Sequence, residues 1–405
     1  MNGPAPDSVA AAIERLVRAD QGRLLAALIA RLGSFQLAED AMQEALESAV
    51  THWSRNGVPE RPQGWVLRVA GRKAIDRLRR DGSENRKIAA LRPLLSDLEQ
   101  ADKPEIADDR LRLIFTCCHP ALERKTQMAL TLRTICGLST GEVAALFLDT
   151  EVAMGQRLTR AKAKIAKAGI AYAVPGPDQW PDRLQSVLSV IYLVFSADYA
   201  SSAIASRNLA QEAIFLASLL NQLRPEDAEI EGCLALLNLT NARRAARTDW
   251  QGVSVPLGNQ DRTKWDSDLI AQGLALIDRA MTRGRPGPYQ IKAAIAALHC
   301  RTNPPDWKQI VMLYDSLLRF EPTPVVRLQR AVALAEAGWL EGALEAIAWL
   351  EPALDEYQPF HAARAELFSR AGDKSHARLA YQRALHLTRN PADRALLEQK
   401  LKMLG

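Results

Sequence analysis

The stretch LSTGEVAALFLDTEVAMGQRLTRAKAKIAK, residues 138–167, predicts two helices joined by a tight turn. Ser139 or Thr140 is a suitable N-cap for the first helix, because a side-chain oxygen at this position accepts a hydrogen bond from a free backbone N–H group of the first turn. Residues 148–150 form the expected turn. The apolar face of the first helix comprises Val143, Ala144 and Phe147.

The second helix of this stretch is strongly basic. Residues 150–167 carry five basic side chains and one acid, Glu151. A helix, a tight turn and a basic helix are the layout of a helix-turn-helix, whose second helix enters the major groove of duplex DNA by its N-terminal part. Val152 and Leu158 are then expected to pack inward, whereas Gln156 can pair with adenine. The residues expected to face base edges are Ala153, Gly155 and Gln156, and those expected to lie along phosphates are Arg157, Arg160, Lys162 and Lys164. For this stretch alone, the alternative is a solvated basic face on an ordinary amphipathic helix.

A second basic segment precedes the first by about sixty residues. RPQGWVLRVAGRKAIDRLRR, residues 61–80, has six basic side chains from Arg68 onward and a single acid in that part, Asp76. Trp65 lies at its start and Trp53 a few residues upstream. Aromatic rings beside a basic helix suit single-stranded or unpaired nucleic acid, because bases stack on the rings and the phosphates follow the cations.

The charge of the chain is unevenly distributed. The 405 residues carry a formal net charge of +5, and residues 1–175 hold 26 Lys and Arg against 21 Asp and Glu, so the remainder is neutral overall. This asymmetry favours a polyanionic partner for the first part of the chain.

Composition otherwise indicates a soluble globular protein. Hydrophobic residues make up 48% and charged residues 24%. The apolar run at residues 187–195 is about half of a membrane span, and the N-terminus lacks the layout of a secretory signal, so we expect no membrane association and a cytoplasmic location. The five cysteines lack paired spacing and favour reduced thiols over a disulfide framework.

Helical periodicity predominates along the chain, and strict apolar-polar alternation is scarce, which predicts an all-α protein. The proline-rich segment at residues 174–183 and the polar residues 80–109 provide breaks. Near the C-terminus, a set of small residues recurs after 34 residues, which is the period of the tetratricopeptide (TPR) helix pair. The matched positions are Ala331, Gly338, Ala343 and Ala346, followed by Ala365, Gly372, Ala377 and Ala380.

Taken together, these motifs resemble a known family. LAEDAMQEALESAV, residues 37–50, with the basic segment after it, is similar to region 2 of the extracytoplasmic-function sigma factors of bacterial RNA polymerase. RLRLIFTCCHPAL, residues 110–122, and the stretch quoted first are similar to region 4. The remainder resembles the branch with a TPR-like helical extension, through SVIYLVFSADYA, LGNQDRTKWD and GPYQIKAAIAALH. The resemblance implies a region 2 domain over 1–90, a linker over 91–107, a region 4 helix-turn-helix domain over 108–172, and a helical domain over 173–405 with TPR-like repeats near 289–405.

The resemblance also implies partners for each segment. The helix around residues 37–50 would bind the clamp helices of the largest subunit of core RNA polymerase through Asp40, Gln43, Glu44 and Glu47, and region 4 would bind its flap. The basic helix of region 4 would recognise the minus-35 element of promoter DNA as duplex. The minus-10 element would be bound, as its duplex opens, by Trp65, Arg68, Arg72, Lys73, Arg77, Arg79 and Arg80. Such a protein catalyses no reaction and needs no cofactor.

One motif departs from the family. Relatives carry an Asn-Glu-Gly triplet where this chain has Ser196, Ala197 and Asp198. If the triplet mediates the contact between the extension and the rest of the chain, that contact is altered here, and Asp198 would replace the missing carboxylate. We expect the extension to regulate the sigma function, within the chain or through a regulatory protein partner.

Three other classes of protein remain to be weighed. A helix-turn-helix regulator with a TPR-like sensor domain would bind DNA without polymerase, but it leaves residues 37–80 unexplained. A repeat scaffold with an incidental basic face leaves both basic segments unexplained. An enzyme or metalloprotein is disfavoured, since the consecutive Cys117, Cys118 and His119 point about 100° apart on a helix and cannot easily converge on one metal.

Overall fold

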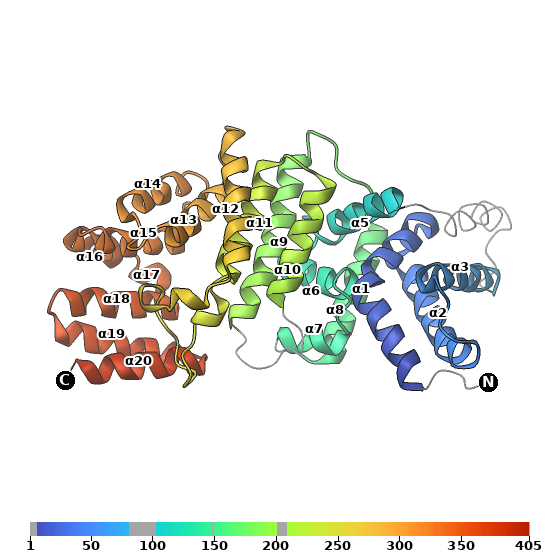
Figure 1. Cartoon of the computed structure of the whole chain (residues 1–405), viewed down its shortest axis with the longest axis horizontal. Coiled ribbons are helices and arrows are strands. Elements are labelled where there is room, and N and C mark those ends of the chain that lie inside the picture. The colour runs from blue at the N-terminus through green and yellow to red at the C-terminus, as the bar shows by residue number, and fades with distance from the viewer. Residues whose placement is uncertain (1–5, 81–102, 148, 201–208, 405) are drawn as a thin grey trace. The chain divides into compact units, whose positions relative to one another are not determined.

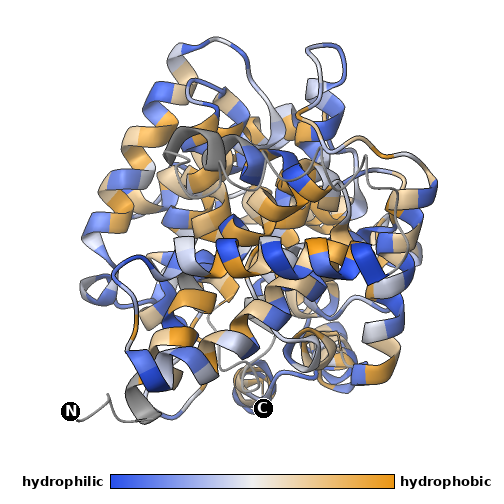
Figure 2. Cartoon of the chain, turned by 90° about the vertical axis from the view of Figure 1, so that its right-hand side faces the viewer, coloured by the Kyte–Doolittle hydropathy of each residue, from blue (hydrophilic) through white to orange (hydrophobic). Residues whose placement is uncertain are grey.

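The computed structural model confirms an all-α chain. It describes residues 6–80, 103–147, 149–200 and 209–404, and within them the only β-type pairing is an isolated bridge between Thr248 and Ser254. The chain forms two compact units, one up to Val194 and the other from Phe195 onward (Figure 1). The helices carry both apolar and polar residues along their length (Figure 2).

Unit 1 begins with three helices, α1 (Pro6–Leu32), α2 (Phe35–Asn56) and α3 (Pro62–Arg80). Ser34 caps α2 by accepting a hydrogen bond from the backbone N–H of Leu37 at 3.3 Å. Gly57 ends this helix with a φ of 82°, a conformation that favours glycine. Helices α2 and α3 pack against each other and against α1, and many of their buried residues are small: Ala38, Ala41, Ala45 and Ala49 in α2, and Ala70, Gly71 and Ala74 in α3.

The next four helices are α5 (Lys103–Cys117), α6 (Arg124–Thr134), α7 (Thr140–Leu146) and α8 (Glu151–Lys167). The expected N-cap is confirmed at Ser139, which forms a reciprocal capping box with Glu142. Thr150 caps α8, since its hydroxyl accepts a hydrogen bond from the N–H of Ala153 at 3.2 Å. These two caps set where the helices of the helix-turn-helix begin. The expected linker at residues 91–107 lies outside the described residues up to residue 102, and α5 begins at Lys103.

Helix α1 joins the two halves of unit 1. It packs against α5 and α6 as well as α2, and a Cβ added to Gly22 would lie 2.5 Å from the carbonyl oxygen of Ile135. Arg31 pairs with the buried Asp109 at 3.1 Å. The Tyr172 hydroxyl donates to the carbonyl oxygen of Asp109 at 2.8 Å and lies 3.1 Å from that of Ala26. The three-helix domain and the helix-turn-helix therefore share a packed interface.

Helix α9 (Trp180–Ala200) crosses the boundary between the units, because its residues up to Val194 belong to unit 1. Trp180 packs against Phe115 with ring centroids 5.1 Å apart, and Arg183 donates to the carbonyl oxygen of Phe115 at 2.7 Å. The extension expected from residue 173 thus contributes its first helix to the packing of unit 1.

Unit 2 continues with a layer of long helices: α10 (Leu209–Leu223), α11 (Ala228–Asn241), α12 (Ser267–Thr282) and α13 (Pro288–Arg301). Helix α11 is buried along its length and contacts the other three. Its Glu231 is buried and accepts hydrogen bonds from Arg283 at 2.8 and 2.9 Å. Glu229 accepts the backbone N–H groups of Tyr289 and Gln290, each at 3.1 Å, and so caps α13, whose own N-cap, Gly287, has no side chain.

The chain ends in stacked helix pairs, as the 34-residue period predicts. The helices are α14 (Trp307–Leu317), α15 (Pro324–Glu336), α16 (Leu340–Ala348), α17 (Glu351–Leu354), α18 (Gln358–Arg370), α19 (Lys374–Leu387) and α20 (Pro391–Met403) (Figure 1). Gly338 and Gly372 occupy equivalent turns with φ of 93° and 81°. Ala331 and Ala365 are fully buried at the matching helix contacts. Successive apolar clusters link each pair to the next, which is the organisation of a repeat array.

Candidate nucleic-acid interface

The orientation of α8 follows from its buried residues. Met154, Leu158, Ala161 and Ile165 are buried, at successive spacings of four, three and four residues, and form the apolar face of the helix. Val152 is 73% exposed, so the expectation that it packs inward is wrong. Thr150 fixes the start of the helix, and with this start Met154 lies on the buried face. Val152 lies two residues earlier, so its side chain points about 200° away from that of Met154.

The positions expected to face base edges differ in their surroundings. Gln156 is exposed, whereas Ala153 is half-buried. Gly155 is also half-buried, and a Cβ added there would lie 3.9 Å from the methyl group of Thr140, in α7. Of the three, Gln156 is therefore the residue whose side chain is most available to a base.

Three of the four cations expected along phosphates already have partners within the fold. Arg157 pairs with Asp149 at 3.2 Å, and Lys162 pairs with Glu39 of α2. Lys164 donates to the carbonyl oxygen of Ala121. Arg160 is exposed and has no carboxylate partner in the part of the chain that the structure describes.

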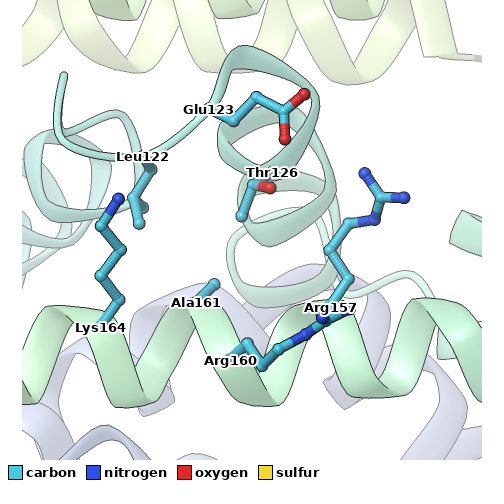
Figure 3. A pocket seen from close by; sticks show the side chains of 7 residues that line it. All are labelled: Leu122, Glu123, Thr126, Arg157, Arg160, Ala161 and Lys164. Carbon is cyan, nitrogen blue, oxygen red and sulfur yellow. The ribbon is translucent and has the colours of Figure 1, made fainter.

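Part of this face is hollowed. A pocket of about 320 Å³ lies between α8 and the start of α6. Arg157 and Lys164 flank it, and Arg160 lies along α8 at its base (Figure 3). The N-cap of α6, Glu123, makes no side-chain capping bond, so the first N–H groups of that helix have no side-chain cap. The Nε of Arg157 is buried without a hydrogen-bond partner among the described residues. The cations and the helix N-terminus favour an anion at this pocket, whereas the carboxylate of Glu123, which also lines it, opposes one.

The second basic helix, α3, divides its cations between two faces. Arg77 lies 3.1 Å from Asp40 and 3.3 Å from Glu44, and Lys73 lies 3.8 Å from Glu44. Two residues expected to bind DNA are therefore paired with two residues expected to bind polymerase. The remaining cations of α3, Arg68, Arg72, Arg79 and Arg80, are exposed.

The aromatic residues beside α3 have different roles. Trp53 is fully buried, so the expectation that a base stacks on its ring is wrong. Trp65 is half-buried, packs edge-on against Trp53 at a centroid distance of 5.4 Å, and stacks on His52 at 5.4 Å. The core of the three-helix domain takes one indole and leaves the other partly accessible.

The acidic side of α2 is similarly divided. Asp40 and Glu44 are half-buried by their contacts with α3, whereas Gln43 and Glu47 are exposed. Gln43 donates to Glu47 at 3.1 Å, one helical turn further on. The side chain of Asp198, in the triplet that departs from the family, lies outside the described residues.

The cysteines are packed as core side chains. Cys117 and Cys118 are buried, and burial raises the pKa of the Cys118 thiol to about 11. No group of three or more His, Cys, Asp or Glu residues with the spacing of a metal site occurs among the described residues. Within those same residues, no helix is both long and apolar enough to cross a membrane.

Sequence reasoning missed Glu39 and Asp149 as partners of the basic helix. Asp149 is only eight residues from Arg157, so its negative charge beside the turn was an available signal. Glu39 and Lys162 are 123 residues apart, and nothing in local spacing connects them. The exposure of Val152 could have been predicted only from the position of the N-cap, Thr150.

Comparison with known families matches two segments of unit 1. Residues 16–84 match the model for Sigma-70 region 2, and residues 112–165 match that for Sigma-70, region 4. Residues 183–281 match a family of unknown function, DUF6596.

A relative and a solved structure extend the comparison. Uncharacterized protein R00370 of Rhizobium meliloti is 42% identical over 397 residues, covering 94% of this chain and 93% of that protein. The TPR domain of P58(IPK) covers 99% of this chain at 11% identity, but the TM-score of 0.26 is too low to bear on the fold. Regions 2 and 4 in order, a helical extension after them and a relative of nearly the same length identify this chain as a member of the extracytoplasmic-function sigma factors, in the branch with a C-terminal helical extension.

Proposed function

We propose that this protein binds core RNA polymerase, directs it to a specific set of promoters, and is regulated by its own C-terminal helical domain. The observation that carries the proposal is that unit 1 contains two basic helices with different surroundings. Helix α8 follows the capped turn of a helix-turn-helix, which suits duplex DNA, and α3 carries the partly accessible Trp65, which suits an unpaired base. In its N-terminal half, α8 exposes Val152 and Gln156, which suits the major groove of the minus-35 duplex.

Helix α3 is proposed to bind the minus-10 element. Its exposed arginines would follow the phosphates of the non-template strand, and the accessible part of Trp65 would stack on a base that leaves the duplex. Unstacking a base costs a few kcal/mol, which stacking and phosphate contacts can offset. Lys73 and Arg77 serve this site less directly, because they are paired with α2.

The pocket beside α8 is proposed to hold a backbone phosphate of the minus-35 element. Its three cations and the start of α6 supply positive charge and N–H donors. A phosphate there would also satisfy the Nε of Arg157. Such a contact fixes the position of the helix on the duplex without selecting a sequence.

Helix α2 is proposed to bind the clamp helices of the polymerase, and region 4 its flap. Gln43 and Glu47 are the exposed polar residues available for the first contact. Asp40 and Glu44 would take part only if their ion pairs with α3 rearranged. Replacing Gln43 and Glu47 by alanine is expected to weaken polymerase binding while the helix itself remains folded.

The regulatory role of the extension is supported by α9. This helix belongs to unit 1 up to Val194, where it packs against Phe115, and continues into unit 2, so it is the segment through which the extension would act on region 4. Truncation after Val194 keeps that packing and removes the remainder, and it should change transcription if the extension regulates. Equal transcription by the truncated and full-length chains, with unchanged helix content, would contradict the regulatory role.

The test of the sigma function is run-off transcription with purified core polymerase on pooled genomic fragments. Discrete new transcripts are expected with the full chain, and they should vanish when Arg157 and Arg160 are both alanine. Duplex binding without polymerase binding or new transcripts would instead support the helix-turn-helix regulator.

A further inference from the structure

The first turn of α8 exposes an apolar side chain that the fold does not use. Val152 is 73% exposed, while Met154, two residues later, is fully buried. Packing therefore explains Met154 and leaves Val152 unexplained. A single exposed apolar side chain needs no explanation by itself, but Val152 lies at the N-terminal end of the second helix of a helix-turn-helix, which is the part that reads base edges.

The side chains around Val152 indicate which kind of partner its surface would bind. The next exposed polar side chain on its side of the helix is Gln156, one turn later. Glu151 lies beside α7 instead, with its carboxylate oxygens 3.4 and 3.6 Å from where a Cβ on Gly141 would be. Toward its C-terminal end the helix carries the exposed cations Arg160 and Lys164. The leading face thus combines a branched apolar group with an amide, and the charge behind it is complementary to DNA.

The major groove offers a matching pair of groups. Thymine presents a C5 methyl group there, which is recognised by apolar contact, and adenine presents N6 and N7, which are recognised by a glutamine amide. We propose that Val152 contacts the C5 methyl of a thymine in the upstream duplex element and so determines base preference at that position. This inference rests on the proposed function, in which α8 lies in the major groove.

The spacing of the two side chains places the two contacts. A helix rises 1.5 Å per residue, so four residues advance by about 6 Å. Duplex DNA advances about 3.4 Å per base pair. The thymine contacted by Val152 therefore lies within about two base pairs of the position at which Gln156 recognises adenine.

Removal of single methyl groups from the DNA tests the proposal. The probe is a promoter found by the run-off assay, remade with deoxyuridine in place of each thymine of its upstream element in turn. Complexes of core polymerase with the full-length wild type or Val152→Ala are compared for promoter binding. Met281→Ala, which removes another exposed apolar side chain from α12, is the matched control.

One thymine is expected to matter to the wild type and not to the variant. Deoxyuridine there should weaken wild-type binding roughly fourfold, the equivalent of one buried methyl group. Val152→Ala should show no such penalty, and Met281→Ala should behave as wild type. The proposal is overturned if every deoxyuridine is tolerated by the wild type, if the penalty persists in Val152→Ala, or if the element contains no thymine. Absence of any transcript on unmodified DNA would instead refute the sigma function itself.

Discussion

The two basic helices of unit 1, α3 and α8, have similar compositions but present their charges differently. In α3, Lys73 and Arg77 are paired with acids of the adjacent α2, whereas Arg68, Arg72, Arg79 and Arg80 are exposed. In α8, Arg157 pairs with Asp149 of the preceding turn, and Lys162 pairs with Glu39, which again lies in α2. The number of cations in a helix therefore does not determine which are available to DNA. That depends on where the fold places the acids.

The largest expected effect concerns the two apolar residues at the start of α8. Met154→Ala should destabilise the helix-turn-helix by about 2–5 kcal/mol, because it empties a buried site. Val152→Ala should change stability by less than about 0.5 kcal/mol. Hydrogen exchange of the backbone amides in α7 and α8 reports the difference locally. Equal acceleration in both variants would mean that Val152 is part of the core.

The next effect concerns Arg160, an exposed cation of α8 that has no carboxylate partner among the described residues. Arg160→Ala should weaken binding to a minus-35 duplex roughly fivefold at 0.15 M salt, and reduce the slope of log affinity against log salt by about 0.9. Arg319→Ala, which removes an exposed arginine from unit 2, is the control and should leave both quantities unchanged. An unchanged slope for Arg160→Ala would exclude a phosphate contact.

A smaller effect, of opposite sign, is expected at Glu39. Glu39→Gln removes the charge that holds Lys162, and the freed cation should tighten duplex binding about two- to fivefold and steepen the salt slope. The double variant Glu39→Gln with Lys162→Ala should lose this gain. If Glu39→Gln alone weakens binding, the ion pair orients α8 for DNA rather than competing with it.

The smallest effect distinguishes the two faces of α3. Arg77→Ala removes two partly exposed ion pairs and should cost less than about 1 kcal/mol of stability, with little change in promoter opening. Arg72→Ala should leave stability unchanged and reduce opening, because Arg72 is exposed and has no carboxylate partner within the described ranges. Permanganate reactivity of minus-10 thymines measures opening. The reverse ranking would place the DNA on the α2 side of the helix.

Local signals in the sequence were sufficient for much of the fold. Ser139 as an N-cap, the helix-turn-helix around it and the 34-residue repeat with glycines at 338 and 372 are confirmed, because capping and turn geometry depend on residues close in the chain. The family resemblance, resting on several motifs in order, is confirmed by the matches to regions 2 and 4.

The misplaced residues share a physical reason. Val152 and Met154 are both apolar, and which of them is buried depends on the residue at which α8 begins, which Thr150 sets as the N-cap. Trp53 lies in α2 and Trp65 in the first turn of the basic α3, and the fold buries only Trp53 completely. The partner of Lys162 lies 123 residues away in the chain, and that of Lys73 lies in the preceding helix, so both ion pairs depend on how the helices pack.

The central claim is that α8 holds the upstream duplex while α3 captures the opened strand. The most direct measurement is a combined nuclease and permanganate footprint of one promoter bound by core polymerase with wild type, Arg160→Ala or Arg72→Ala. We predict that Arg160→Ala weakens upstream protection, and that Arg72→Ala keeps that protection but makes the downstream thymines less reactive. Loss of both signals in both variants, or of neither, would contradict the division of labour between the two helices.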